Sequence, residues 1–301
     1  MERSGGTAVN ILFQLVRDAM PYGLVTAVRR RRAVARDQQQ RAEMHEERHS
    51  RIRDLDHSPA RRSSELIDPF QYESLIDFHV SRGLSRASVV EGSIPAASLS
   101  FIREVLRESV AQTPLHGLHI GNYVGVSLAY IAATLRSLHP DSRTVAIDPN
   151  LPHRGTVNPQ SHVAALLRAC GLHGDVILAA GYSGVKSVSN DGVIFDGYDP
   201  FANHDEEAGV ENVLHSLSLL YPHRFGFAIL DGNHDAGYLR TELDCVARLL
   251  TPKSLVVLDD VNDAWLEIKK VYRNLGDSRF EALSTDGRVG ILRHISDANE
   301  C

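Results

Sequence analysis

Cysteine is scarce in this sequence and apolar runs are short, and both absences exclude classes of protein. The 301 residues include three cysteines, Cys170, Cys245 and Cys301, which are odd in number and far apart. Neither a disulfide framework nor a cysteine-based zinc site is indicated, and a reducing compartment suits this usage. No run is apolar for long enough to span a bilayer, and residues 8–16 lack the flanks of a signal peptide. We therefore expect a cytoplasmic protein without a transmembrane segment.

An excess of positive charge is also absent. The formal net charge is −6, with 43% hydrophobic and 23% charged residues. These fractions are ordinary for a globular protein, and the negative sign argues against an electrostatic nucleic-acid binder. The length suits one large α/β domain or two small ones.

The composition changes near residue 63. Before it, four arginines at 29–32 and three glutamines at 38–40 lead into mixed charges. We expect residues 1–62 to form a basic helical or partly disordered arm, because a charge run is usually a solvated face. A helix that binds a membrane surface or a partner, including a second copy in a homo-oligomer, is the alternative. Residues 63–301 would form the main domain, beginning with a helical cover over 63–113.

After Pro114, short apolar segments alternate with helical ones. The strand-like segments are residues 115–120, 144–147, 176–179, 225–230 and 254–258. Short apolar strands separated by helices predict a parallel sheet covered on both faces. The chain then ends differently, with strand-like residues 280–283 and 289–293 around an Asp-Gly pair, which predicts a hairpin.

A glycine turn follows the first strand and an aspartate follows the second. Gly121 and Gly125 lie in a turn between residues 115–120 and a predicted helix. Glycine permits a tight turn and close approach to a ligand, and the helix N-terminus attracts an anionic group. Asp148 can accept hydrogen bonds from ribose hydroxyls, or it is simply a turn residue. Together the two motifs predict an adenosine-containing cofactor.

Carboxylates also follow the next two strands. Asp231 follows residues 225–230, and Asp259 with Asp260 follows residues 254–258. The carboxyl ends of the strands are where ligands bind in open α/β sheets. Converging carboxylates repel one another unless a cation lies between them, and oxygen ligands suit Mg²⁺ or Mn²⁺. Asp259 and Asp260 can share one ion only if the strand ends at Asp259 and the chain turns.

Helix capping is the alternative for these aspartates, and a histidine lies among them. Asp231 or Asp235 could cap the helix that follows the fourth strand, and Asp260 or Asp263 the helix after the fifth. His234 lies in the same loop as Asp231. Histidine is the usual general base near neutral pH, so His234 is the candidate base.

These motifs resemble a known family. Residues 119–127 resemble motif I of class I S-adenosylmethionine-dependent methyltransferases, which reads Glu-x-Gly-x-x-x-Gly-x-Ser. Asp231-Gly232-Asn233-His234 and Asp259-Asp260 resemble two signatures of its metal-dependent sugar and macrolide O-methyltransferases, distant relatives of catechol O-methyltransferase. The resemblance covers about residues 115–294. It implies a Rossmann-like fold, with a mostly parallel seven-stranded sheet that ends in an antiparallel hairpin.

The resemblance also implies roles for single residues. The cofactor S-adenosylmethionine would be bound by His119, Gly121, Gly125, Ser127 and Asp148. A divalent metal, Mg²⁺ or Mn²⁺, would be bound by Asp231, Asp259 and Asp260. His234 would then take the proton of an acceptor hydroxyl whose pKa the metal lowers. The expected reaction is O-methylation of a small molecule such as a sugar or a polyketide.

Two departures from the family pattern keep alternatives open. His119 stands where motif I has an acidic residue, and Glu242 stands where the strand-four signature has its last aspartate. The long segment 186–223 is interpreted as an insertion on the substrate side. The alternatives are a non-catalytic cofactor-binding protein on the same scaffold and an NAD(P)-dependent Rossmann enzyme. The second should show Gly-x-Gly-x-x-Gly after its first strand, which this sequence lacks there.

Overall fold

A computed structural model describes residues 66–109, 115–183, 213–275 and 279–295. The predicted arm, residues 1–62, lies outside the described residues, as does most of the predicted insertion, 186–212. Both therefore stay predictions. None of the helices in the described ranges is long and apolar enough to cross a membrane.

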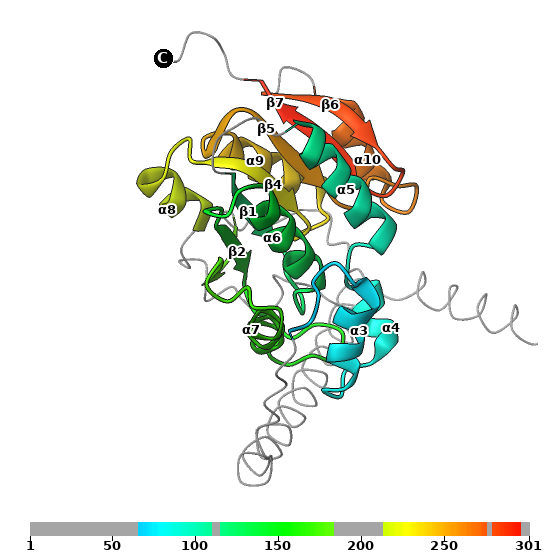
Figure 1. The fold of residues 1–301 in the computed structure, drawn as a ribbon. Coiled ribbons are helices and arrows are strands. Elements are labelled where there is room, and N and C mark those ends of the chain that lie inside the picture. The colour runs from blue at the N-terminus through cyan, green and yellow to red at the C-terminus, as the bar shows by residue number, and fades with distance from the viewer. Residues whose placement is uncertain (1–65, 110–114, 184–212, 276–278, 296–301) are drawn as a thin grey trace, which may run out of the picture. The chain divides into compact units, whose positions relative to one another are not determined.

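One seven-stranded sheet forms the centre of the domain (Figure 1). Its strands are β1 (His116–Ile120), β2 (Thr144–Asp148), β3 (Val176–Ala180), β4 (Phe225–Leu230), β5 (Leu250–Leu258), β6 (Phe280–Thr285) and β7 (Gly290–His294). Their spatial order is β3-β2-β1-β4-β5-β7-β6. The first five run parallel, whereas β7 is antiparallel to both β5 and β6. The predicted mostly parallel seven-stranded sheet with a final antiparallel hairpin is confirmed.

The strands lie where the short apolar runs predicted them, except that β5 begins earlier. It starts at Leu250 rather than at residue 254. Lys253 has a φ of 65°, and the pairing of β4 with β5 shifts register between Phe225 and Phe227. Thr251, Pro252 and Lys253 are not apolar, so the first half of this strand lacks the apolar run that marks the other strands.

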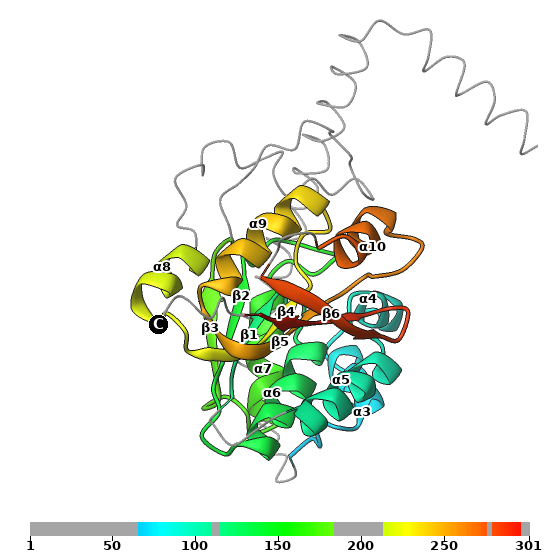
Figure 2. The ribbon, with the colours of Figure 1, turned by 90° about the horizontal axis from the view of Figure 1, so that it is seen from above.

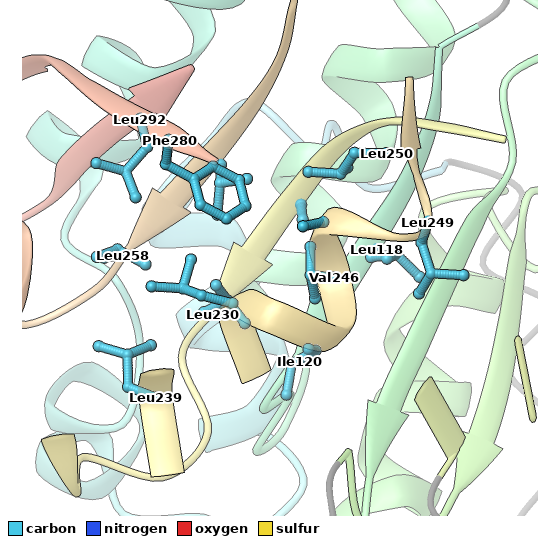
Figure 3. Close-up of a cluster of buried hydrophobic side chains, with 14 of the residues drawn as sticks. Leu118, Ile120, Leu230, Leu239, Val246, Leu249, Leu250, Leu258, Phe280 and Leu292 are labelled. Atoms are coloured by element: carbon cyan, nitrogen blue, oxygen red, sulfur yellow. The ribbon is translucent and has the colours of Figure 1, made fainter. Parts of the chain in front are cut away.

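Helices cover both faces of the sheet (Figure 2). One face packs against α8 (Val213–Leu220), α9 (Ala236–Ala247) and α10 (Leu266–Arg273). The other packs against α5 (Ala96–Ser109), α6 (Val126–Leu138) and α7 (Pro159–Ala169), with α3 (Tyr72–Val80) and α4 (Arg86–Glu91) next to them. Figure 3 shows sheet side chains such as Leu118 and Leu230 against the α9 side chains Leu239 and Val246. Each fully buried side chain of this kind contributes about 1.5–3 kcal/mol.

The described part of residues 63–113 is largely helical. Leu99, Ile102 and Leu106 lie three and four residues apart along α5 and are buried on one face of it. α4 begins at a Ser85 cap whose side chain accepts a hydrogen bond from the backbone N–H of Ser88. These helices bury the α6 side of the sheet.

The topology brings several loop ends to one edge. The carboxyl ends of β1, β2, β4 and β5 share that edge because these strands are parallel. Leu258 at the end of β5 pairs with Gly290 at the start of antiparallel β7. The turn between β6 and β7 therefore also lies at this edge, beside the residues that follow β5.

Candidate cofactor and acceptor site

The glycine turn after β1 lies against the chain that leaves β4. Gly121 has a φ of 81° and Gly125 a φ of 91°, which favour glycine. A Cβ on Gly121 would lie only 1.9 Å from the backbone oxygen of Asp231. The backbone N–H of Asp231 also donates to Ile120, at 2.9 Å. The glycine turn and the first carboxylate are therefore packed directly against each other, at the N-terminal end of α6.

Asp148 ties this turn to the end of β2. Its two carboxylate oxygens accept hydrogen bonds from the backbone N–H groups of Asn122, at 2.8 Å, and Asn150, at 2.7 Å. Burial raises the pKa of Asp148, while these hydrogen bonds act to lower it. Asp148 therefore does act as a turn residue, which was the alternative to ribose binding. Each oxygen has a further lone pair that could accept a ribose hydroxyl.

Two residues of the predicted cofactor set, His119 and Ser127, are buried. His119 is 1% exposed, and neither ring nitrogen has a hydrogen-bond partner among the described residues. Burial lowers the pKa of His119 to about 4, against smaller opposing effects of Asp231, Asn122 and Gly121, so the ring is neutral at pH 7. The buried hydroxyl of Ser127 accepts a hydrogen bond from the backbone N–H of Ile94, at 2.9 Å. Ser127 thus joins α6 to the helical cover.

The second cluster gathers Asp231, His234, Asp259 and Asp260. β5 ends at Leu258, and Asp260 has a φ of 58°. The chain therefore turns directly after Asp259, which is the condition for two adjacent aspartates to face one centre. His234 Nδ1 lies 2.8 Å from Asp260 Oδ2, and His234 Nε2 lies 3.7 Å from Asp231 Oδ1.

His234 is held on a third side by an aromatic ring. The Trp265 ring meets it edge to face, with centroids 4.4 Å apart and planes at 76°. Burial lowers the pKa of His234, but hydrogen bonds and charge attraction from Asp231 and Asp260 outweigh burial and raise this pKa to about 10. His234 is therefore an imidazolium at neutral pH before any ligand binds.

Arg288 is a member of this cluster that the sequence analysis missed. Its Nε and one terminal nitrogen donate to the two oxygens of Asp259, at 3.1 and 2.7 Å, and its other terminal nitrogen forms an ion pair with Asp260 Oδ1. Burial and the charges of Asp231 and Asp260 raise the pKa of Asp259, while Arg288 opposes that rise. The signal for Arg288 was the predicted hairpin, because a strand antiparallel to β5 places its preceding turn beside Asp259.

The predicted metal ligands can be tested against these contacts. One ligand atom each from Asp231, His234 and Asp259 lie within 4.8 Å of one another. Both oxygens of Asp259, however, already accept from Arg288, and the two oxygens of Asp260 pair with Arg288 and His234. The predicted set of Asp231, Asp259 and Asp260 comes together, but two of its members are occupied by cationic side chains. This arrangement does not fit a divalent ion.

Helix capping accounts for one aspartate only. Asp235 caps α9, where its side chain accepts from the backbone N–H of Tyr238 at 2.7 Å. α10 has Trp265 at its N-cap and no side-chain cap hydrogen bond. Capping therefore explains Asp235, and Asp231 and Asp260 stay with the cluster.

A buried acid lies behind the cluster. Glu242 on α9 is 1% exposed, and Ser183 donates a hydrogen bond to its Oε1. The Tyr238 hydroxyl lies 3.0 Å from the same Ser183 hydroxyl. Burial raises the pKa of Glu242 to about 8, against lowering effects of Ser183 and of the charge on His234. Glu242 is thus largely protonated at neutral pH.

The sheet defines the class of fold. An antiparallel strand between β5 and β6 distinguishes this order from the dinucleotide-binding order 3-2-1-4-5-6. The domain therefore has the class I methyltransferase fold, the fold of enzymes that take a methyl group from S-adenosylmethionine.

Comparison with known proteins gives the family. Residues 118–261 match the sequence model of the family described as "Methyltransferase domain". Residues 118–261, from β1 to the residues that follow β5, therefore belong to this methyltransferase domain family. No curated protein sequence matches the chain.

Several solved structures are similar to this chain. A Podospora anserina methyltransferase solved with S-adenosylhomocysteine is 17% identical, over 83% of this chain and 97% of that one, with a TM-score of 0.49. A Geobacter sulfurreducens methyltransferase is 15% identical, over 82% and 96%, with a TM-score of 0.46. A TDP-rhamnose 3′-O-methyltransferase of calicheamicin biosynthesis is 17% identical, over 80% and 90%, with a TM-score of 0.45.

Proposed function

We propose that this protein transfers the methyl group of S-adenosylmethionine to a hydroxyl oxygen of a small molecule, such as a sugar, a polyketide or another natural product. The observation that carries the proposal is the pair formed by His234 and Asp260, at 2.8 Å, beside the glycine turn. A histidine held through Nδ1 by a carboxylate keeps Nε2 for proton transfer. O-methylation requires such a base, because the hydroxyl loses its proton as the new bond forms.

The turn between β1 and α6 suits the cofactor. Gly121 and Gly125 let this positive-φ turn pack closely against Asp231 and Val163, and the N-terminus of α6 favours the cofactor's carboxylate. Asp148 would accept the ribose hydroxyls through its remaining lone pairs. Bound there, S-adenosylmethionine supplies an electrophilic methyl carbon next to a sulfonium sulfur. His119 is neutral and buried, so we assign it no ionic contact with the cofactor.

In the proposed transfer step, these side chains would bind, orient and deprotonate. With S-adenosylmethionine as methyl donor and its thioether as the leaving group, His234 would take the acceptor's hydroxyl proton at Nε2. Asp260 accepts a hydrogen bond from Nδ1, whose proton stays on the ring, and stabilises the imidazolium that forms. His234 must first be neutral, and the nearby sulfonium charge lowers its pKa. Orientation of the two reactants supplies much of the rate.

The predicted divalent metal has no step in this scheme. Arg288 and His234 already occupy the carboxylates that would hold it. Metal assistance stays a prediction from the sequence.

Calorimetry and turnover together test this proposal. S-adenosylhomocysteine should bind the purified protein with micromolar affinity, with or without Mg²⁺, and His234→Gln should leave that affinity unchanged. The same variant should lower methyl transfer by about 10²–10⁴-fold, which is the usual contribution of a positioned base. His173→Gln, an exposed histidine on the described surface, is the matched control and should keep full turnover.

Two results would contradict parts of the proposal separately. Absence of S-adenosylhomocysteine binding would refute the cofactor assignment. Binding with undiminished turnover in His234→Gln would refute the role of the base and leave the cofactor site standing.

A further inference from the structure

We propose that Arg288 takes the place of a divalent metal in this site, so that methyl transfer proceeds without one. The guanidinium contributes the fixed positive charge that Asp259 and Asp260 require, and Asp260 also pairs with the proposed base His234. The role toward the acceptor rests on the proposed function. The occupation of the carboxylates rests on the geometry alone.

Each oxygen of the paired aspartates already has a cationic partner, which is Arg288 for three of them and His234 for the fourth. Asp259 is bound in the bidentate fork geometry that matches a carboxylate to a guanidinium. Asp260 is shared between Arg288 and His234, and the Asn262 amide also donates to its Oδ1, at 3.1 Å. A dication on Asp259 would have to share an oxygen with this fork and lie next to a like charge.

The hairpin turn holds Arg288 in this position. The side chain of Asp286 accepts from the backbone N–H groups of Arg288 and Val289, both at 2.8 Å. The backbone oxygen of Arg288 accepts from Val261, at 2.8 Å, directly after Asp260. The turn and the aspartates are thus joined by main-chain as well as side-chain bonds, so the charge is preorganised rather than recruited by a flexible surface arginine.

Arg288 keeps capacity for a ligand. Three of its five N–H groups serve the aspartates, and its side chain is 34% exposed. The remaining N–H groups could donate to an acceptor oxygen as that oxygen becomes negative. A hydrogen-bond donor acidifies a hydroxyl less than direct coordination, which can bring the pKa of water from about 15.7 toward 7. The acceptor class this favours is a hydroxyl that is already acidic, such as a phenol with a pKa of about 10.

Binding of Mn²⁺ alone, followed by electron paramagnetic resonance, tests the occupation of the site. The full chain is stripped with a chelator and titrated with Mn²⁺, without cofactor or acceptor. We expect no saturable site in the parent protein. Arg288→Gln should bind one ion per chain, at least about tenfold more tightly than the detection limit that the parent protein sets, because removal of a like charge a few ångströms away is worth at least that factor.

Matched variants make the result specific. Arg288→Lys keeps the charge and should bind Mn²⁺ no better than the parent protein. Arg293→Gln removes another arginine of the same hairpin, paired with Glu281 at 3.1 Å, and should also leave Mn²⁺ binding unchanged. Asp259→Asn added to Arg288→Gln should abolish the new site. Circular dichroism of each variant shows whether it has folded.

Two outcomes would overturn the inference. One is a saturable Mn²⁺ site in the parent protein that Asp259→Asn removes, a measurement that needs no Arg288 variant. The other is a folded Arg288→Gln protein that binds Mn²⁺ no better than its parent. Neither depends on S-adenosylhomocysteine or on turnover, so failure of the proposed function is seen separately. Phenolic and alkyl hydroxyl acceptors, assayed with a chelator present, then test the acceptor class: faster methylation of the alkyl hydroxyl would refute it.

Discussion

Glu242→Gln should gain stability relative to the parent protein as pH rises from acid to alkaline. Glu242 is fully enclosed, and burial raises its pKa from 4.5 to about 8. The unfolded chain releases this proton above pH 4.5, whereas the folded chain holds it until about pH 8. The stability contributed by the protonated carboxyl is therefore complete below pH 4.5 and is lost as pH rises to about 8.

The size of the effect follows from the same two values. At 1.36 kcal/mol per pKa unit, the rise corresponds to about 5 kcal/mol of stability by pH 9. Glutamine is neutral at every pH, and its Oε1 can still accept from Ser183. The second side-chain oxygen, Oε2, is buried without a partner among the described residues, so the glutamine NH₂ adds a cost that does not vary with pH.

Urea unfolding at about pH 5 and about pH 9 measures this difference. The free energy of unfolding of the variant minus that of the parent protein should increase by several kcal/mol between the two conditions. Glu281→Gln, which removes an exposed partner of Arg293, should change stability by less than about 1 kcal/mol at either pH. A difference between Glu242→Gln and the parent protein that is equal at both pH values would refute the reasoning.

Two further substitutions examine the site. Asp231→Asn removes one of the carboxylates that raise the pKa of His234. The pH at which methyl transfer reaches half its maximum should therefore fall by about one unit or more. Asp244→Asn, at an exposed position of α9, should leave that pH unchanged. Gly121→Ala places a Cβ 1.9 Å from the backbone oxygen of Asp231, so both thermal stability and S-adenosylhomocysteine affinity should fall. Gly155→Ala is its control, because Gly155 also has a positive φ but has open space around it. A Gly121→Ala protein with unchanged affinity would show that the turn does not contact the cofactor.

The sequence predicted those features of the fold that depend on local patterns. Leu230 and Leu258 each end an apolar run, and an aspartate follows each of them. The sequence therefore predicted that Asp231 and Asp259 lie at the same edge of the sheet. Asp260 could be assigned to the same cluster only on the condition that the chain turns after Asp259. The local sequence does not reveal the positive φ of Asp260 that makes this turn. The start of β5 was missed because Thr251, Pro252 and Lys253 interrupt the apolar run that marks a buried strand.

Longer-range contacts were harder to predict. Ser127 matches its motif position, yet its hydroxyl accepts from Ile94, which belongs to a segment that the motif does not include. Arg288 lies in a turn whose residue types predict only a hairpin. Its partners are 29 residues away for Asp259, and that distance closes only when β7 inserts between β5 and β6.

The pairing of β5 with β7 therefore affects the site as well as the core. Register in a sheet is usually a matter of which side chains reach the core, and a slip of one residue reverses the two faces. Here the pairing of Leu258 with Gly290 also determines how far the turn reaches along the edge of the sheet. A one-residue insertion between Asp286 and Val289 could leave every core leucine in place and still carry the guanidinium past the aspartates. Loop length, which most surface hairpins tolerate freely, is in this domain part of the chemistry.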